Sequence, residues 1–424
     1  MARAGGGRWT VETQHATVAE GGLDLDCGRR LDGVTVAYEC YGRPNAARDN
    51  AILVCHALSG GAHAAGWHEG AAKPGWWDVL VGPGKALDTD RFFVISSNVL
   101  GSCYGTTGPS SIDPGTGRPY GSRFPVVTIA DMVRVQRALV ERLGITRLRA
   151  VAGGSMGGMQ ALQWAVQYPD AVASVIALAT SPSHSPQQIA FNEIARRAVM
   201  SDPNWRGGDY YDGEPPRAGL AVARMLGHVT YLSDRGMERK FGRRRRPGAR
   251  PYGFDAEFEV EGYLQHQGQA FVDRFDANSL VTLSRALDAF DLTEGRASLA
   301  DALTATDAAF LLLSFSSDWL YPPYQLDAVA NALRRAGRPV TCDTLPSDYG
   351  HDAFLLEHEA QAPVIRAFLA SAAAPRELHA TTAPHLPDNP LGPLSEKEPS
   401  RCRLPLDHPA GLPPPSVPCL PAGS

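Results

Sequence analysis

The sequence predicts an α/β protein built on a mostly parallel sheet, and three observations lead to that prediction. Short runs rich in Val, Ile and Leu recur along the chain, segments of helical period separate them, and several runs are apolar at nearly every position. Continuous apolar runs are typical of strands that helices cover on both faces, as in βαβ units. The expected strands are residues 34 to 39, 51 to 55, 92 to 97, 148 to 152, 173 to 179, 309 to 315 and 339 to 345.

The positions of the expected strands divide the chain into four parts. We expect a sheet core over residues 1–181, a helical insertion over 182–305 that acts as a lid, and the second part of the core over 306–370. Residues 371–424 hold 13 prolines among 54 residues and no Phe, Trp or Tyr. Such a segment buries too little surface to offset its ordering entropy, so we expect a disordered tail.

Size and charge exclude several classes of protein. A chain of 424 residues exceeds the usual span of one compact domain, and its 44% hydrophobic content is enough for a sizeable core. The net charge of −5 lacks the basic excess that nucleic-acid binding requires. No stretch approaches the roughly 18 apolar residues of a membrane span, and the N-terminus has no apolar signal region. We therefore expect neither a nucleic-acid nor a membrane partner, and a cytoplasmic protein.

Cysteine usage agrees with a reducing compartment. The seven cysteines are scattered, odd in number and without a CxxC pair. This pattern argues against both a disulfide framework and a structural zinc site.

One basic run, RKFGRRRRPGAR at residues 239–250, lies inside the helical insertion. Gly and Pro interrupt it, and Phe241 is its single aromatic residue. We therefore favour a solvated loop over a phosphate-binding patch.

The strongest local motif is GGSMGG at residues 153–158, which follows an expected strand and opens a helical stretch. It matches the G-x-S-x-G nucleophile elbow in its strand, turn and helix context. The tight turn requires residues without Cβ around the serine, which predicts Ser155 as a nucleophile. Such a turn can also merely pack against its neighbours or hold a phosphate, but the GxxxxGK[ST] pattern of a phosphate loop is missing.

A serine nucleophile needs a base and a carboxylate that orients the base. In chain order these partners follow the serine as Asp or Glu and then His. Asp318 follows the expected strand 309 to 315, and His351 lies in the loop after 339 to 345. Asp352 is an alternative carboxylate, but adjacent side chains diverge, so we favour Asp318.

An oxyanion hole needs two backbone N–H groups aimed at the developing charge. We expect one from Met156, directly after the nucleophile, and the other from Leu58 in the loop CHALSGG. The nearby His56, His63 and His68 have neither one-face helical spacing nor a finger pattern, so we assign them structural roles and expect no metal.

Six motifs of the chain together resemble those of a known family. GGSMGGMQALQWA, DWLYPP, YGHDAFLLE, HALSG, NVLGSCYGTTGP and ARMLGHVTYLS together are similar to homoserine O-acetyltransferases, acyltransferases of methionine biosynthesis with an α/β-hydrolase fold. The resemblance runs from about residue 10 to 370. It implies a two-step transfer in which Ser155 takes the acetyl group of acetyl-CoA and the hydroxyl of L-homoserine then accepts it. His351 would be the base and acid, Asp318 its orienting group, and acetyl-CoA a co-substrate with no bound cofactor.

The resemblance also implies a substrate pocket. Arg224 corresponds to the arginine that holds the homoserine carboxylate, and Asp352 to the carboxylate that holds its ammonium. A zwitterion suits a cation and an anion at opposite ends. Tyr231 lies two helical turns after Arg224 and completes the expected pocket. In members that use succinyl-CoA we expect an arginine just after the Trp of the Asp-Trp motif. This chain has Leu320 there, which predicts acetyl-CoA.

Several alternatives stay open at this stage. The same triad serves an esterase or lipase, a non-catalytic scaffold is a further class, and succinyl-CoA is another possible donor. L-serine, shorter by one methylene, is another acceptor, and one methylene gives only about 1 to 3 kcal/mol of discrimination. By analogy with the family we expect a homodimer.

Overall fold

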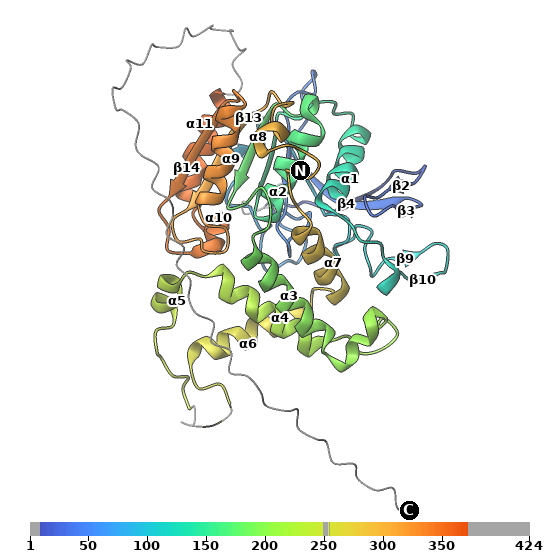
Figure 1. The fold of residues 1–424 in the computed structure, drawn as a ribbon, viewed down its shortest axis with the longest axis vertical. Coiled ribbons are helices and arrows are strands. Elements are labelled where there is room, and N and C mark those ends of the chain that lie inside the picture. Colours follow the sequence, from blue (N-terminus) through green and yellow to red (C-terminus); the bar gives the residue numbers. More distant parts are fainter. Residues whose placement is uncertain (1–8, 249–252, 254, 372–424) are drawn as a thin grey trace, which may run out of the picture. The chain divides into compact units, whose positions relative to one another are not determined.

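The computed structural model describes residues 9–248, 253 and 255–371, and an eight-stranded sheet runs through its centre (Figure 1). The strand order is β1-β4-β8-β5-β11-β12-β13-β14. All pairs from β8 to β14 are parallel, whereas β4 is antiparallel to both β1 and β8. The sheet strands are β1 (Gln14–Val18), β4 (Val34–Tyr41), β5 (Ala51–Cys55), β8 (Phe93–Ser97), β11 (Ala150–Gly154), β12 (Ser174–Leu178), β13 (Ala309–Phe315) and β14 (Val340–Leu345).

This architecture confirms the predicted α/β fold class with a mostly parallel sheet. Each of the seven expected strands is present, within two residues at either end. The sequence-based prediction missed β1, which adds an antiparallel edge next to β4. Three further pairs of two-residue strands lie outside the main sheet: β2 (Leu23–Asp24) with β3 (Arg30–Leu31), β6 (Val81–Gly82) with β7 (Leu87–Asp88), and β9 (Ile112–Asp113) with β10 (Arg118–Pro119).

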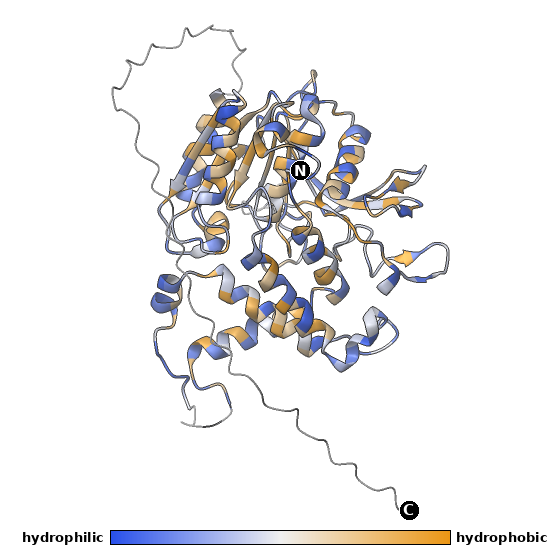
Figure 2. Ribbon diagram, viewed as in Figure 1, coloured by the Kyte–Doolittle hydropathy of each residue, from blue (hydrophilic) through white to orange (hydrophobic). Residues whose placement is uncertain are grey.

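Burial on both faces explains why the central strands are apolar throughout. Successive residues of a strand point to opposite faces, so Leu53 and Val151 enter one hydrophobic core and Ile52 and Ala152 enter the other. Figure 2 shows hydrophobic residues along these central strands. Helices α1 (Ile129–Arg142), α2 (Met156–Gln167) and α9 (Tyr324–Arg335) contribute to the first core, while α10 (Ala353–Leu356) and α11 (His358–Ser371) contribute to the second.

A helical segment separates β12 from β13. Its helices are α3 (Pro186–Met200), α4 (Arg217–Tyr231), α5 (Asp234–Lys240), α6 (Glu259–Val272), α7 (Ala277–Asp288) and α8 (Leu299–Ala302). Helix α4 packs between α3 and α6, and the three lie together beyond one end of the sheet (Figure 1). A capping box starts α3, because the Ser185 hydroxyl accepts the Gln188 N–H and the Gln188 side chain accepts the Ser185 N–H.

Three arginines of the basic run form ion pairs. Arg244 forms an ion pair with Glu259 at 2.7 Å, Arg245 with Glu257 at 2.9 Å, and Arg239 with Asp348 at 3.2 Å. These pairs agree with a surface loop. Residues 249 and 250 of the run lie outside the described residues, as does the predicted disordered tail apart from residue 371. None of the described helices is long and apolar enough to cross a membrane.

Candidate active site

Ser155 occupies a strained turn between β11 and α2. Its backbone has φ 58° and ψ −125°, a conformation that L-residues rarely adopt. The neighbouring glycines provide space, because a Cβ at Gly157 would collide with the carbonyl of Cys55 and one at Gly154 with the ring of Phe354. The strain therefore falls on the serine itself, and the glycines allow the close approach of neighbouring segments.

The structure brings the three predicted triad residues into one hydrogen-bonded chain. His351 Nε2 lies 2.9 Å from Ser155 Oγ, and His351 Nδ1 lies 2.8 Å from Asp318 Oδ2. All three side chains are buried. The second oxygen of Asp318 accepts the backbone N–H groups of Leu320 and Tyr321 at 3.0 and 2.8 Å. This carboxylate is thus fixed toward the ring, and Asp352 is not the group that contacts His351 Nδ1.

A rigid loop brings Leu58 close to the nucleophile. His56, which is fully buried, accepts the backbone N–H of Val99 at Nε2 (3.0 Å), and its Nδ1 pairs with the Ala57 carbonyl at 2.7 Å. Burial lowers the pKa of His56 to about 4, so this ring is a neutral structural group. Leu58 and Ser155 line the same cavity, and Met156 is the first residue of α2, where backbone N–H groups lack helical acceptors.

The cavity at Ser155 encloses about 760 Å³ including its open part. One wall comes from α4 and α6 and carries Arg224, Tyr231 and Phe271. The Arg224 guanidinium carbon lies 4.7 Å from the Phe271 ring centroid and 5.6 Å from that of Tyr231. Arg224 also donates to Ser59 Oγ at 3.4 Å, and among the described residues no carboxylate lies within ion-pair distance of it. Among the described residues, the cation of this cavity therefore has no ion-pair partner.

Asp352 follows His351 in the chain and is not among the residues that line this cavity. Burial raises the pKa of its carboxyl group above the ordinary value, and the positive charges of Arg224 and Lys240 oppose that shift. Burial also raises the pKa of Tyr231, which feels both Arg224 and Asp352. The charge of Arg224 thus acts on both Asp352 and Tyr231, and the charge of Asp352 also acts on Tyr231.

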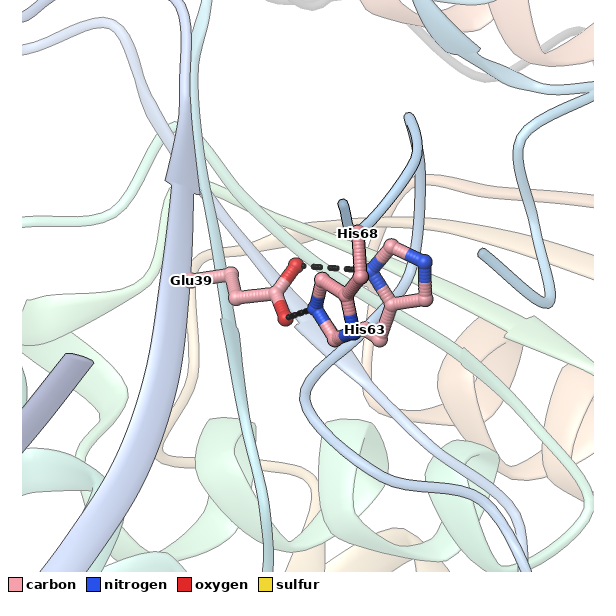
Figure 3. A group of neighbouring side chains, drawn as sticks. All are labelled: Glu39, His63 and His68. Carbon is pink, nitrogen blue, oxygen red and sulfur yellow. Dashed lines mark hydrogen bonds and ion pairs between the residues drawn. The ribbon is translucent and has the colours of Figure 1, made fainter. Parts of the chain in front are cut away.

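Glu39, His63 and His68 form a separate cluster whose ligand atoms lie within 4.8 Å of one another (Figure 3). Each ring contacts its own carboxylate oxygen, His68 Nε2 at 2.8 Å and His63 Nδ1 at 3.0 Å. Thr13 and Tyr41 donate to the same carboxylate at 2.8 and 2.7 Å. The two rings stack with centroids 3.7 Å apart and an interplanar angle of 27°.

The contacts to the Glu39 carboxylate form a hydrogen-bonded clamp. Glu39 is fully buried, and the four donors lower its pKa although burial alone would raise it. The clamp holds the segment that follows the Leu58 loop. The sequence-based reasoning weighed His63 and His68 but missed Glu39, whose signal is a lone acid in an otherwise buried strand run.

The sequence-based prediction also missed two polar residues of the cavity, His184 and Tyr321. The Tyr321 ring stacks on that of His351 at a centroid distance of 4.9 Å, and its hydroxyl lies 2.7 Å from His184 Nε2. Leu320, which is predicted to select the acyl donor, also lines the cavity.

Comparison with known proteins gives the fold and the family of the chain. Residues 50–358 match the family model described as alpha/beta hydrolase fold. A homoserine O-acetyltransferase of Methanohalobium evestigatum is 57% identical over 348 residues, which cover 82% of this chain and 71% of that protein. The crystal structure of homoserine O-acetyltransferase from Bacillus anthracis has a TM-score of 0.80 at 32% identity and covers 85% of this chain and 98% of its own. Esterase E22 has a TM-score of 0.79 at 34% identity, covering 85% and 100%.

Fold and site define an enzyme of the α/β-hydrolase fold with a Ser-His-Asp arrangement. Within that class, identity over most of its length shows that the chain belongs to the homoserine O-acetyltransferase family. The family predicted from the sequence motifs is thereby confirmed.

Proposed function

We propose that this enzyme transfers the acetyl group of acetyl-CoA to the hydroxyl of L-homoserine, giving O-acetyl-L-homoserine and CoA. One observation carries the proposal: Ser155 and the unneutralised Arg224 line the same cavity. An acceptor with a carboxylate needs such a cation within reach of the nucleophile, whereas the hydrolysis of an apolar ester does not.

In the first half-reaction His351 removes the proton of Ser155 Oγ, and the oxygen attacks the thioester carbonyl. Asp318 holds the ring and stabilises the imidazolium that forms. The N–H groups of Met156 and Leu58 serve as the oxyanion hole. The C–S bond then breaks, the CoA sulfur takes the proton from His351, and an acetyl ester remains on Ser155.

In the second half-reaction homoserine enters the same cavity. Arg224 binds its carboxylate and Asp352 its ammonium, while Tyr231 completes the pocket. His351 takes the proton of the homoserine hydroxyl, which attacks the acetyl carbon. The bond to Ser155 Oγ breaks, and His351 returns the proton to that oxygen.

The acyl side of the cavity favours an uncharged acyl group. Leu320 is apolar, and Arg196, the cation of the adjoining network, is 2% exposed and paired with Asp288 at 2.7 Å and Glu193 at 3.0 Å. Among the described residues that line this cavity, the one arginine open to a succinyl carboxylate would be Arg224, which the proposal assigns to the carboxylate of homoserine. We therefore propose acetyl-CoA as the donor. A higher transfer rate with succinyl-CoA than with acetyl-CoA would contradict this choice.

Ester hydrolysis is the second candidate, because esterase E22 is similar over its whole length. The experiment is a steady-state comparison of purified enzyme with acetyl-CoA and either L-homoserine, L-serine or water as acceptor, with the acyl product identified by mass. We expect O-acetyl-L-homoserine as the main product. Faster hydrolysis of simple esters than transfer to homoserine would support the esterase interpretation, and faster transfer to L-serine would change the acceptor.

Three broader expectations complete the proposal. The helices between β12 and β13 form the lid over Ser155. Exposed Ile194 on α3 and Val222 on α4 are candidate dimer contacts, which light scattering would test. The five described cysteines are free, which supports a reducing, cytoplasmic setting (Cys27, Cys40, Cys55, Cys103 and Cys342).

A further inference from the structure

Arg274 follows α6 and joins the wall of the Ser155 cavity to the protein surface. It is exposed and is not among the residues that line the cavity, but its Nη1 donates at 3.4 Å to the carbonyl of Ser59, which does line it. The same Nη1 donates to the Tyr104 hydroxyl at 2.6 Å. We call the place where exposed Arg274 meets Ser59 the cavity rim.

Neutral groups hold Arg274 at the rim, and in the described part of the chain no carboxylate lies within ion-pair distance of it. The Ser59 carbonyl is neutral, and burial raises the pKa of the Tyr104 hydroxyl, so that group keeps its proton. The guanidinium carbon also lies 5.1 Å from the Phe271 ring centroid. Among the described residues these hydrogen bonds use only Nη1, so the donors on Nε and Nη2 remain for a ligand.

The acidic residues near Arg274 in the chain are engaged with other partners. Asp273 forms an ion pair with Arg217 at 2.6 Å. Asp276 caps α7, and its carboxylate also accepts the Tyr210 hydroxyl at 2.6 Å. Arg274 is therefore a positioned cation that these two carboxylates leave without an ion pair.

Arg274 and Arg224 share two neighbours, Ser59 and Phe271. On the cavity side, Arg224 donates to Ser59 Oγ at 3.4 Å, and its guanidinium carbon lies 4.7 Å from the Phe271 ring centroid. At the rim, Arg274 contacts the carbonyl of the same serine and the same ring. Two cations that share neighbours in this way repel each other, and a bound anion relieves that repulsion.

The proposed reaction brings two kinds of anion to this cavity. Homoserine has a single carboxylate, which the proposed function assigns to Arg224. Acetyl-CoA has phosphate groups, and its pantetheine arm separates them from the thioester. When the thioester reaches Ser155, the phosphates must therefore lie away from the nucleophile, toward the protein surface. A guanidinium suits them, because two of its N–H groups can pair with two oxygens of one phosphate.

We propose that Arg274 binds a phosphate group of acetyl-CoA at the cavity rim, and so favours CoA thioesters over acyl donors without phosphate. The inference rests on the proposed function. Because Arg274 is exposed, salt screens its attraction for phosphate. Its contribution therefore falls on the binding of the donor, while Ser155 and His351 carry out the chemical step.

The test compares two donors that carry the same thioester. Acetyl-CoA has phosphate groups and S-acetylpantetheine has none. Thiol release in the presence of L-homoserine gives kcat/KM for each donor. We expect Arg274→Gln to lower kcat/KM for acetyl-CoA roughly 3- to 10-fold at low ionic strength, a smaller loss than at a buried site because solvent screens the charge. The value for S-acetylpantetheine should not change, and added salt should reduce the difference between the wild-type enzyme and the variant.

A binding measurement gives a readout that does not depend on turnover. The Kd of CoA, measured by calorimetry, should rise by a similar factor in Arg274→Gln and by less in Arg274→Lys, which keeps the charge but loses the planar fork. Arg142→Gln is the matched control, because it removes an arginine whose side chain is 55% exposed and which lies on α1, outside the helical segment. An unchanged Kd in Arg274→Gln, or an equal rise in Arg142→Gln, would overturn the inference.

The remaining outcomes distinguish this inference from the proposed function. If the wild-type enzyme releases no thiol from acetyl-CoA, the proposed function is wrong. If it does, but Arg274→Gln lowers kcat/KM equally for both donors or for neither, only the inference is overturned. A higher KM for homoserine with an unchanged kcat/KM for acetyl-CoA would also overturn it, and would place Arg274 beside Arg224 in the acceptor site.

Discussion

His351 Nε2 lies 2.9 Å from Ser155 Oγ although 196 residues separate them in the chain. The parallel sheet causes this proximity, because β11 and β14 both end at the same edge. Ser155 follows β11 directly, and His351 follows β14 after a short loop. Loops at the carboxyl ends of parallel strands are the usual place for ligand sites in such sheets.

The carboxylate behind His351 gives a first prediction. Asp318→Asn keeps the size of the side chain but presents an amide to Nδ1, which favours the wrong ring tautomer. We expect kcat to fall about 10³- to 10⁴-fold with little change in melting temperature. Steady-state rates and thermal unfolding check this. Asp352→Asn is the comparison, because loss of this carboxylate should raise the KM for homoserine more than it lowers kcat. If kcat falls as much in Asp352→Asn as in Asp318→Asn, or more, then Asp352 is the orienting carboxylate.

Arg224 gives the second prediction. Arg224→Lys keeps a charge but loses the planar fork, and Arg224→Ala loses both. We expect the KM for homoserine to rise roughly 10- to 100-fold in the alanine variant, as for a lost charge-assisted hydrogen bond, while acetylation by acetyl-CoA stays near the wild-type rate. Separate measurement of the two half-reactions checks this. An unchanged KM for homoserine would remove Arg224 from the acceptor pocket.

The raised pKa of Asp352 gives a pH prediction. Burial favours the neutral acid, which cannot attract an ammonium group, although Arg224, Lys240 and the neighbouring His351 favour the carboxylate. As pH falls, Asp352 therefore protonates earlier than an ordinary Asp, and the KM for homoserine should rise there. Asp352→Asn should show a high KM for homoserine that does not rise further as pH falls. The acetylation rate, which does not involve the acceptor, serves as the reference. The same pH-dependent rise of KM in the wild-type enzyme and in Asp352→Asn would contradict the assignment.

The predictable part of the site is local in sequence. The elbow and the strand ends that carry Asp318 and His351 each follow from a short stretch of chain, whereas the family resemblance implied Arg224 and Tyr231. The structure brings Ser155, His351 and Asp318 within hydrogen-bonding distance, while their catalytic roles stay predictions for the mutants. The strands were predictable because burial on both faces leaves a continuous apolar run, whereas β1 (QHATV) has only two buried residues and escaped notice.

The missed residues depend on contacts between distant segments. Tyr321 belongs to the DWLYPP motif, but only the folded chain brings its hydroxyl to His184, 137 positions earlier. Glu39 meets His63 and His68 only because β4 lies beside their loop, 24 and 29 positions away. No periodicity or spacing rule reports such pairs.

The Glu39 clamp gives a prediction on stability. Glu39→Gln places an amide donor among four donors and breaks a fully buried network. We expect a loss of about 2 to 4 kcal/mol in the free energy of unfolding. Glu39 has a lowered pKa, so its contribution is complete above the pKa of an unfolded Glu and is lost as pH falls through its folded value. Exposed Glu12→Gln is the control. Zinc and EDTA should leave the melting temperature unchanged; a rise with zinc that Glu39→Gln abolishes would establish a metal site.

The most direct test of the central claim is the intact mass of the protein after mixing with acetyl-CoA, followed by a chase with L-homoserine. The account predicts one acetyl group per chain, located on Ser155, absent from Ser155→Ala, and transferred to homoserine on the chase. An enzyme that transfers acetyl to homoserine without ever carrying it, or that carries it on another residue, would contradict the acyl-enzyme mechanism.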